Sequence, residues 1–451
     1  MVENLVQDRL GHALFGLVTA LTSLTTIVAV LSDLGLTHFS VKRLASEPGF
    51  MSEYFPTLLP LRAGLNLVAL ALMVALGALL GYEGKQLVVL SAVGISLLLT
   101  QYAQFLRGTL QASQRFNTDA LLSVLEKALL LLLVLACLPV GLTLERYVGA
   151  RLVAAGFTAA LLYGLLVRLF GKQPYRYRWD QARSVLRQSL PFALITLLYG
   201  INERVDMVML ERIASPVEAG YYAGAYRWVD AVMMYVWTIL PLFFAKFAAA
   251  QHNREEQREL LWFGQRVVTV PLLLLVAFVL FRGEQLFWQL THSSAAEIAR
   301  MSWCVRILFI NVLVHAFFAL YASLLNSTGH VHFVSRLVVV SLGLNVTLNA
   351  LTLPHYGAIA AAWNTLVCAI VVSAGYVVLV RRAGVAVPWT LLARLLAAFG
   401  GLCAAWYALQ QYAQLPWLLE SAVATVIFGV LVLGLGVVRL SELRQIRRSV
   451  R

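Results

Sequence analysis

Long, continuously apolar stretches alternate with short polar connections along the whole chain. A helix needs roughly 20 apolar residues to cross the hydrocarbon core of a bilayer, and each stretch is close to that length. The stretches lack the alternation of apolar and polar residues that marks barrel strands, which argues against a transmembrane β-barrel. The pattern therefore predicts an all-α, polytopic transmembrane helix bundle of about 13 spans. We place the spans at residues 13–36, 57–81, 86–106, 118–139, 147–167, 189–210, 218–247, 261–281, 301–326, 333–353, 357–380, 390–409 and 416–438.

The composition supports a membrane protein. Apolar residues make up 60% of the 451 residues and charged residues only 13%, whereas soluble proteins average about 45–50% and about 25%. Since so few charges cannot cover so much apolar surface, the excess must face lipid. The same figures exclude a disordered chain, a collagen-like fibre and a disulfide scaffold.

Lysine and arginine gather in alternate connections between the spans. About 25 of the 35 basic residues fall on one side of the membrane in this arrangement. Cytoplasmic loops carry an excess of Lys and Arg, so this side is predicted to be cytoplasmic. The pattern places the 168–188 connection and the tail after Arg439 inside the cell, and the 140–146 and 282–300 connections outside. The localisation that follows is the cytoplasmic (inner) membrane, with several passes and the C-terminus inside.

Charge, cysteines, histidines and the lack of enzyme motifs narrow the range of possible functions. The net charge of +13 follows from the loop asymmetry, so we predict no nucleic-acid partner. The four cysteines stand singly in apolar stretches, which indicates buried thiols. The histidines His330 and His332 lack the further ligands of a metal site. No phosphate-binding loop, nucleophile elbow or zinc-protease motif is present in the sequence, so we predict no cofactor and no enzyme.

Two short glycine-bearing segments suggest an internal duplication. Residues 10–16 and 215–221 each lead into a long, partly polar helix, but only the second follows a complete apolar span. Internal repeats are common in transporters, so we expect one more helix before Met1 in the natural protein. The predicted organisation is an N-terminal lobe of five spans at 1–170, a basic linker at 171–188, a C-terminal lobe of six spans at 189–380, and two extra helices with a basic tail at 381–451.

Three segments carry a family resemblance. Residues 10–45 include LGHALFG and LSDLGLTHFSVKRLA, residues 190–230 read LPFALITLLYGINERVDMVMLERIASPVEAGYYAGAYRWVD, and residues 345–362 read NVTLNALTLPHYGAIAAA. Together they resemble the polysaccharide and O-antigen flippases (Wzx-type) of the multidrug/oligosaccharidyl-lipid/polysaccharide (MOP) exporter superfamily. The second segment is the most specific, and the resemblance covers most of the chain in order. The chain departs from the family at its start, where the usual first helix is missing.

The resemblance implies a transport function. Such proteins flip an undecaprenyl-pyrophosphate-linked oligosaccharide across the cytoplasmic membrane by alternating access, with two six-helix lobes around a central cavity. The implied partners are this lipid-linked oligosaccharide, membrane lipid, and the polymerase and chain-length proteins of the same pathway. The implied products are surface polysaccharides such as O-antigen (lipopolysaccharide), capsule or exopolysaccharide.

Charges inside the predicted helices are the main candidates for a site. A charge at bilayer depth costs about 2.5–3.5 kcal/mol, so it normally faces a protein interior or a wet cavity. Two interpretations remain open: an ion network that locks a helix hairpin, or the wall of a substrate-binding cavity for an anionic head group. The charged residues of spans 189–210 and 218–247, among which Glu203 and Asp206 are also candidates for cation coupling, are Glu203, Arg204, Asp206, Arg227 and Asp230.

A second candidate for substrate binding lies in the 57–81 span. Arg62 and Asn66 are one turn apart near its predicted cytoplasmic end, where they can meet an incoming pyrophosphate. Alternatively, the Arg62 side chain snorkels to the membrane interface. Asp33 ends a helix within the first motif and is expected to cap or orient the following turn.

Other polar residues in the spans are weaker candidates for a site. Glu126 and Lys127 are adjacent, and their side chains are expected to point apart. Asn345 and Asn349 share one helix face and are expected to form hydrogen bonds between helices rather than to contact cargo.

Two further functions are compatible with parts of the pattern. A cation-coupled multidrug exporter of the same superfamily should have an acidic and aromatic cavity rather than a basic one. A membrane glycan polymerase or ligase should have a long external loop, whereas the longest predicted external connection here is 282–300. We therefore predict a flippase and keep these two as alternatives.

Overall fold

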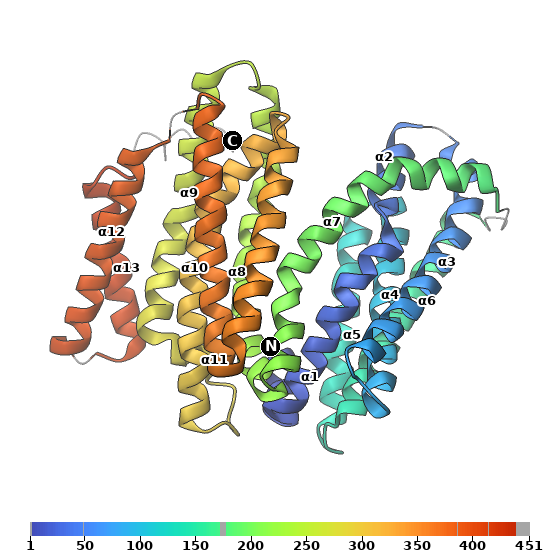
Figure 1. The fold of residues 1–451 in the computed structure, drawn as a ribbon, viewed down its shortest axis with the longest axis horizontal. Coiled ribbons are helices and arrows are strands. Elements are labelled where there is room, and N and C mark those ends of the chain that lie inside the picture. The colour runs from blue at the N-terminus through green and yellow to red at the C-terminus, as the bar shows by residue number, and fades with distance from the viewer. Residues whose placement is uncertain (1, 48, 172–176, 386, 414, 439–451) are drawn as a thin grey trace. The chain divides into compact units, whose positions relative to one another are not determined.

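The computed structural model is built from helices, and the residues it describes include no strand (Figure 1). The described residues are 2–47, 49–171, 177–385, 387–413 and 415–438, so the basic tail after Arg439 and residues 172–176 of the predicted linker lie outside them. The helices are α1 (Val2–Asp33), α2 (Leu36–Ser46), α3 (Phe50–Leu79), α4 (Lys85–Ala112), α5 (Phe116–Cys137), α6 (Leu144–Phe170), α7 (Trp179–Ile213), α8 (Pro216–Ala249), α9 (Arg254–Arg282), η1 (Gly283–Phe287), α10 (Ala295–Ser327), α11 (Val331–Arg382), α12 (Trp389–Ala408), η2 (Leu409–Ala413) and α13 (Trp417–Gly434).

The lengths and apolar character of these helices confirm the predicted all-α membrane bundle. Eleven helices in the described part of the chain are long and apolar enough to cross a membrane. One of them, α11, is two helices joined at a kink, because Gly357 has φ 56° and ψ −132°. The two halves of α11 correspond to two separate predicted spans. The 35-residue α7 corresponds to the predicted span 189–210, and every other predicted span also corresponds to one helix.

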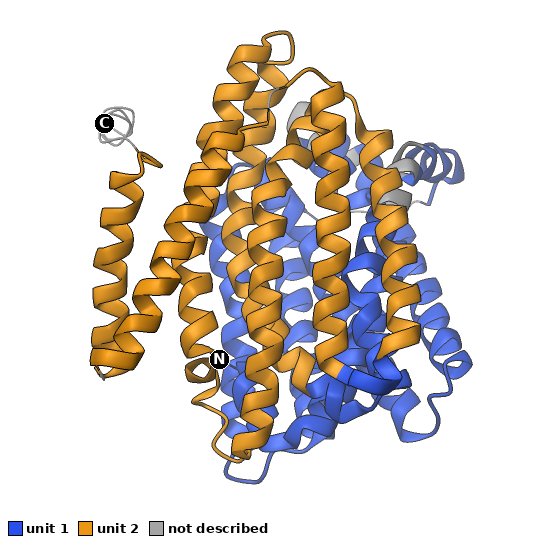
Figure 2. Cartoon of the chain, turned by 60° about the vertical axis from the view of Figure 1, so that its left-hand side comes forward, with its two compact units in different colours: residues 1–220, 353–357 blue, residues 221–352, 358–451 orange. Residues whose placement is uncertain are grey.

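The chain forms two compact units (Figure 2). Unit 1 contains residues 1–220 and 353–357, and unit 2 contains residues 221–352 and 358–451. Unit 1 thus holds α1 to α7 with the first turn of α8 and residues 353–357 of α11, and unit 2 holds the rest of α8 and α11 with α9, α10, α12 and α13. The lobe boundaries at 170 and 188 stay a prediction.

A short glycine-rich contact closes one end of unit 1. The first helix is interrupted at Gly11 (φ 77°, ψ 165°), as the glycine-bearing segment predicted. A Cβ on Gly16 would lie only 2.5 Å from the backbone nitrogen of Gly220, and one on Gly220 would lie 2.8 Å from the carbonyl carbon of His12. The Gln7 amide donates a hydrogen bond to the Gly220 carbonyl at 3.1 Å. The two segments that the sequence relates by duplication therefore pack directly against each other, and only glycine permits this approach.

The opposite end of unit 1 contains a short helix that the sequence analysis left as a connection. Leu34 (φ 42°) and Gly35 (φ 76°) turn the chain at the end of α1 and start α2. The apolar core beneath includes Phe55 and Phe105, whose rings stack at 5.6 Å between centroids. Their burial between α3 and α4 fixes the ends of these helices beside the turn.

In unit 2, polar and aromatic contacts attach the hairpin of α12 and α13 to α9. Arg282 Nε donates to Glu420 Oε2 at 2.9 Å, and the Glu420 side chain is only 1% exposed. The buried Trp406 ring stacks on Phe281 at 5.9 Å between centroids and meets Phe278 edge-on at 6.2 Å.

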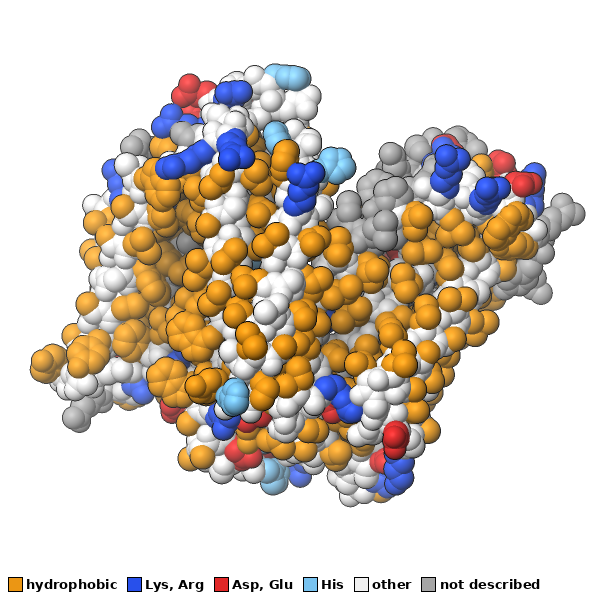
Figure 3. All heavy atoms as spheres, in the orientation of Figure 1, with side chains coloured by type: hydrophobic (Ala, Val, Ile, Leu, Met, Phe, Trp, Pro, Cys, Tyr) orange, Lys and Arg blue, Asp and Glu red, His pale blue; other side chains and the backbone are white. Residues whose placement is uncertain are grey.

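The surface has the polarity of a membrane protein. Hydrophobic side chains cover the long sides of the helices, while Lys, Arg, Asp and Glu side chains gather toward helix ends (Figure 3). Charged groups away from helix ends are therefore exceptions, and they are the natural places to look for function.

Candidate functional site

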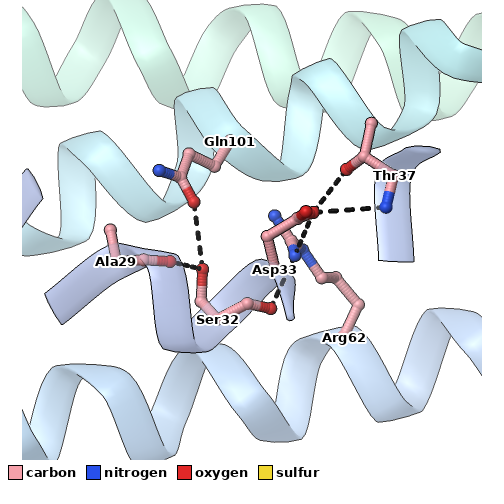
Figure 4. Close-up of polar contacts among 6 residues, drawn as sticks. All are labelled: Ala29, Ser32, Asp33, Thr37, Arg62 and Gln101. Carbon is pink, nitrogen blue, oxygen red and sulfur yellow. Dashed lines mark hydrogen bonds and ion pairs between the residues drawn. The ribbon is translucent and has the colours of Figure 1, made fainter. Parts of the chain in front are cut away.

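An ion-pair cluster joins α1, α2 and α3 at the turn after α1 (Figure 4). Asp33 is the last residue of α1, and its Oδ1 accepts a hydrogen bond from the backbone N–H of Thr37 at 3.3 Å and another from the Thr37 hydroxyl. These bonds satisfy donors in the first turn of α2, where a helix has no internal acceptor for them. Asp33 therefore orients this turn, as predicted.

Arg62 of α3 completes the cluster. Its Nη1 donates to Asp33 Oδ1 and to the backbone carbonyl of Ser32, both at 2.6 Å. The guanidinium carbon lies 5.9 Å from the centroid of the Phe105 ring, within the range of a cation–π interaction. The Ser32 hydroxyl in turn lies 3.0 Å from Gln101 Oε1 of α4 (Figure 4). The cluster thus connects four helices of unit 1 through one turn.

The burial of Arg62 excludes one of its two predicted roles, that of a side chain that snorkels to the membrane interface. Its side chain is only 1% exposed, so it does not snorkel to a membrane interface. Asn66, one turn further along α3, is half-buried, and its Oδ1 has no hydrogen-bond partner among the described residues. The assignment of Arg62 and Asn66 to cargo binding stays a prediction.

The charged residues of α7 and α8 divide between the two units. Unit 1 holds Glu203, which is exposed, Arg204, which is half-buried, and Asp206, which is buried. Unit 2 holds Arg227 and Asp230, both half-buried.

Arg204 and Arg227 both lie well away from the ends of their helices. Arg204 lies nine residues before the end of α7 at Ile213, and Arg227 lies eleven residues after the start of α8 at Pro216, or about 14 and about 17 Å at 1.5 Å per residue. Arg227 Nε donates to the Gly224 carbonyl of its own helix at 3.0 Å. A joint anion site of the two arginines stays a prediction.

Three further polar contacts lie within the helices of unit 1. Of the residues that form them, the sequence analysis named only Glu126 and Lys127, and its expectation that their side chains point apart is wrong, because they form an ion pair. The contacts are Arg107 Nε to Asp119 Oδ1 at 2.5 Å, Arg151 Nη1 to Thr22 Oγ1 at 3.0 Å, and Thr100 Oγ1 to Glu126 Oε1 at 2.9 Å, with Lys127 Nζ 3.8 Å from the same Glu126 oxygen. A lysine in the middle of a 22-residue apolar helix was the signal that could have identified the last of them.

An amide network holds the two halves of α11 together. Asn349 Nδ2 donates to Asn345 Oδ1, and Asn364 Nδ2 donates to Asn349 Oδ1, each at 2.8 Å. Asn364 Nδ2 also lies 2.8 Å from Thr352 Oγ1. The bonds from Asn364 cross the kink at Gly357, so the asparagines bond between helices, as expected from their spacing.

No group of three or more His, Cys, Asp or Glu in the described ranges could hold a metal ion. His330 Nδ1 lies 3.2 Å from the hydroxyl of Thr328 beside it. The four cysteines carry free thiols.

Another polar group is centred on Tyr82 in the turn between α3 and α4. Tyr82 donates a hydrogen bond to Glu211 Oε2 of α7 at 2.6 Å. The guanidinium of Arg212 lies over the Tyr82 ring, 4.1 Å from its centroid, and donates to the Gly81 carbonyl at 3.1 Å. Burial and the hydrogen bond to Glu211 raise the pKa of Tyr82, so its hydroxyl remains a donor throughout the physiological pH range.

The sequence of the chain matches a known family over more than half its length. The profile of the family described as "Polysaccharide biosynthesis protein" matches residues 5–244. This range includes the Asp33–Arg62 cluster and the charged residues of α7 and α8. No curated protein matches this chain in sequence.

Solved structures of transporters are similar in fold. A lipid II flippase MurJ in an inward closed conformation aligns with a TM-score of 0.78, 10% identity and coverage of 95% of both chains. An inward-facing multidrug resistance MATE family transporter of the MOP superfamily aligns with a TM-score of 0.64, 15% identity and coverage of 84% of this chain and 93% of that chain. A MOP superfamily transporter from Pyrococcus furiosus aligns with a TM-score of 0.54, 15% identity and coverage of 84% and 91%. At these identities the similarity establishes the fold.

Proposed function

We propose a cargo and a mechanism for a chain that belongs to the polysaccharide biosynthesis protein family and has the fold of the MOP exporter superfamily. The cargo is an undecaprenyl-pyrophosphate-linked oligosaccharide, which the protein flips from the inner to the outer leaflet of the cytoplasmic membrane by alternating access. The product serves surface polysaccharide synthesis, such as O-antigen, capsule or exopolysaccharide. Partners are then the polymerase and chain-length proteins that use this product.

The observation that carries the proposal is the intramembrane arginine of α7. Arg204 is half-buried and lies about 14 Å from the helix end. The chain belongs to a family described as polysaccharide biosynthesis proteins. A pyrophosphate that crosses hydrocarbon must lose its hydration at a very high free-energy cost. Guanidinium groups replace part of that hydration, and their planar donor pairs match phosphate oxygens better than ammonium does.

The other charged residues take complementary roles in this proposal. Arg227 of α8 is the second guanidinium, and Asp206 and Asp230 limit the affinity so that the head group is released. Glu203 and Asp206 are the candidates for binding a coupling cation. Arg62 and Asn66 mark the place where the head group enters from the cytoplasm: Asn66 contacts the head group, while Arg62 stays paired with Asp33 and positions this end of α3.

Substitutions at the arginines test the proposal. Arg204→Ala and Arg227→Ala should each reduce glycan export about tenfold or more, equivalent to about 1.4 kcal/mol or more of lost head-group stabilisation. Arg→Lys at the same positions should retain partial activity, since the charge remains. Arg212→Ala is the matched control, because Arg212 is a cation of the same helix that binds the Tyr82 ring and the Gly81 carbonyl. Export should be scored against the amount of protein in the membrane.

Two outcomes would contradict these roles. If the alanine variants disappear from the membrane and Asp230→Asn restores Arg227→Ala, the arginines belong to a structural ion network. If both alanine variants export glycan normally, Arg204 and Arg227 do not contact the cargo.

The substrate class needs its own assay. Reconstituted protein should translocate a fluorescent polyprenyl-pyrophosphate oligosaccharide, and it should not confer drug resistance on an efflux-deficient host. Drug efflux without lipid translocation would instead identify a multidrug exporter. Sugar transfer without translocation would identify a polymerase or ligase.

The proposed orientation places the 168–188 connection and the tail after Arg439 in the cytoplasm. The basis is the excess of Lys and Arg in these segments. Single cysteines at 140–146 and at 282–300 should react with an impermeant thiol reagent in intact cells. Reaction of cysteines at 177–183 under the same conditions would overturn the orientation.

A further inference from the structure

The middle of α5 carries two adjacent charges that the proposed arginine site does not use. The helix has 22 residues, and Glu126 and Lys127 lie about 15 Å from either end at 1.5 Å per residue. α5 is among the helices that are long and apolar enough to cross a membrane. Both charges are therefore at the depth of the bilayer centre.

The two charges differ in how they are held. The Thr100 hydroxyl of α4 donates to Glu126 Oε1 at 2.9 Å, and the Glu126 side chain is 17% exposed. Lys127 Nζ lies 3.8 Å from the same oxygen, and the Lys127 side chain is 74% exposed. This separation is too long for a hydrogen bond. The carboxylate is thus fixed by α4, while the ammonium keeps its donors for another anion.

The position of Lys127 around the helix indicates what its side chain meets. Successive residues are rotated by about 100° around the helix axis, which places the exposed Leu121, Val124 and Leu132 on one side of Lys127 and Glu126 on the other. Lys127 therefore stands at the border between the exposed apolar face and the face that carries Glu126 and packs against α4. An ammonium that faces lipid at this depth costs about 2.5–3.5 kcal/mol, so charged side chains in membrane helices normally face a protein interior or a water-filled cavity.

We infer that Lys127 is a binding site for the phosphate groups of the cargo when the head group is at the bilayer centre. The inference rests on the proposed function, because the phosphates of ordinary lipids stay at the membrane surface and only a translocated lipid brings phosphate to this depth. The ammonium moves from Glu126 to the phosphate, and it returns to Glu126 when the phosphate moves on. Because Thr100 holds the carboxylate in place, Glu126 competes with the phosphate and keeps the binding weak enough for release.

Thiol accessibility tests whether Lys127 faces water. In full-length protein whose four native cysteines are replaced, Lys127→Cys should react with a charged, membrane-impermeant thiol reagent, and Leu132→Cys should react at least about tenfold more slowly, since thiolate formation requires water. Leu132 is the matched control because it is exposed on the far side of the apolar face of the same helix. Equal and slow reaction at both positions would show that Lys127 faces lipid or a helix of another protein, and would overturn the inference.

Protection by a phosphate ligand tests binding directly. Ser123→Cys lies one turn from Lys127 on the side of the helix that carries Glu126, and it serves as the reporter, with inorganic pyrophosphate as the probe. Pyrophosphate should slow the labelling of this cysteine severalfold, and Lys127→Gln should abolish the protection. Glu126→Gln should strengthen the protection, because it removes the competing carboxylate. A reporter that is unreactive, or is protected equally with and without Lys127, would overturn the inference.

A transport assay separates this inference from the proposed function. With reconstituted protein and a fluorescent polyprenyl-pyrophosphate oligosaccharide, Lys127→Gln should translocate about tenfold more slowly than wild type, and Lys127→Arg should be close to wild type, since both cations bind phosphate. If wild type translocates the lipid and Lys127→Gln does so equally well, only the inference fails. If wild type does not translocate the lipid, the proposed function fails, and pyrophosphate protection still decides whether Lys127 binds phosphate.

Discussion

Two of the acid–base pairs within the helices of unit 1, Asp33–Arg62 and Glu126–Lys127, are built in opposite ways. In the Asp33–Arg62 pair the cation is 1% exposed, lies 2.6 Å from the carboxylate and also binds the Ser32 carbonyl. In the Glu126–Lys127 pair the cation is 74% exposed and lies 3.8 Å from the carboxylate. A buried cation with fixed partners cannot exchange them cheaply, because any other state leaves a charge desolvated. The comparison indicates that the first pair holds the fold together and that the second can exchange ligands.

Removal of the buried cation is expected to have the largest effect on the free energy of unfolding. Arg62→Ala should lower the free energy of unfolding by about 3–5 kcal/mol, because it leaves Asp33 without its cation at the junction of four helices. The apparent melting temperature of detergent-purified protein is the measurement. The double variant Arg62→Ala with Asp33→Ala should recover part of the loss, since no charge is then left unpaired. An equal loss in both variants would show that packing, rather than charge, is the cause.

A partly exposed pair sharpens the comparison. In unit 2 the carboxylate of Glu420 is buried, but Arg282 is 29% exposed. Arg282→Ala should cost about 2 kcal/mol, because water can reach part of the site and solvate the remaining carboxylate. The loss should appear as weaker attachment of the α12–α13 hairpin, measured by limited proteolysis of the connection between α11 and α12. Arg282→Gln, which keeps a donor for Glu420, should lose less than Arg282→Ala.

Removal of a neutral hydrogen-bond donor from a buried carboxylate should have a smaller effect on the free energy of unfolding. Tyr82→Phe removes the hydrogen bond to Glu211 and should cost about 1 kcal/mol. Because the pKa of Tyr82 is raised in the folded protein, the bond contributes fully below the ordinary tyrosine pKa of about 10 and weakens only as the pH rises beyond it. The difference in melting temperature between wild type and Tyr82→Phe should therefore be constant from about pH 6 to about pH 9. A difference that shrinks within this range would contradict the assignment.

The smallest effect on stability is expected at the exposed cation. Lys127→Leu should change the free energy of unfolding by no more than about 0.5 kcal/mol, because an exposed side chain has few contacts to lose. Its melting temperature should match that of wild type, while translocation falls. A destabilisation as large as that of Arg62→Ala would remove the distinction between the two pairs.

Much of the fold could be predicted from the sequence. The length and continuity of the apolar stretches specified the helices, since a bilayer accepts only segments whose backbone groups are bonded within the helix. The break in α11 falls at the border of the predicted spans 333–353 and 357–380, at Gly357, where φ is positive and glycine is favoured. Helix α2 was missed, because eleven residues of low apolar content give no membrane signal.

The candidate site was less predictable. A single sequence shows how far Arg62, Asp33 and Glu126 lie from the ends of their helices, but it does not show which helices pack side by side. Asp33 and Arg62 are 29 residues apart in the chain, and Thr100 and Glu126 are 26 apart.

The sequence by itself determined that the chain is a membrane helix bundle and which segments form its apolar helices, because hydrophobic transfer and backbone hydrogen bonding are local properties of each segment. It did not fix the helix ends, since α1 begins at Val2 and α7 at Trp179, about ten residues before the predicted spans. The tertiary structure decided which charged side chains within the helices are buried against hydrogen-bond partners and which are exposed. Arg62 and Lys127 are both cations within apolar helices, and no local rule distinguishes them. The difference comes from the neighbouring helices: α1 supplies a carboxylate and a carbonyl to Arg62, whereas α4 supplies a donor that fixes Glu126 and leaves Lys127 exposed.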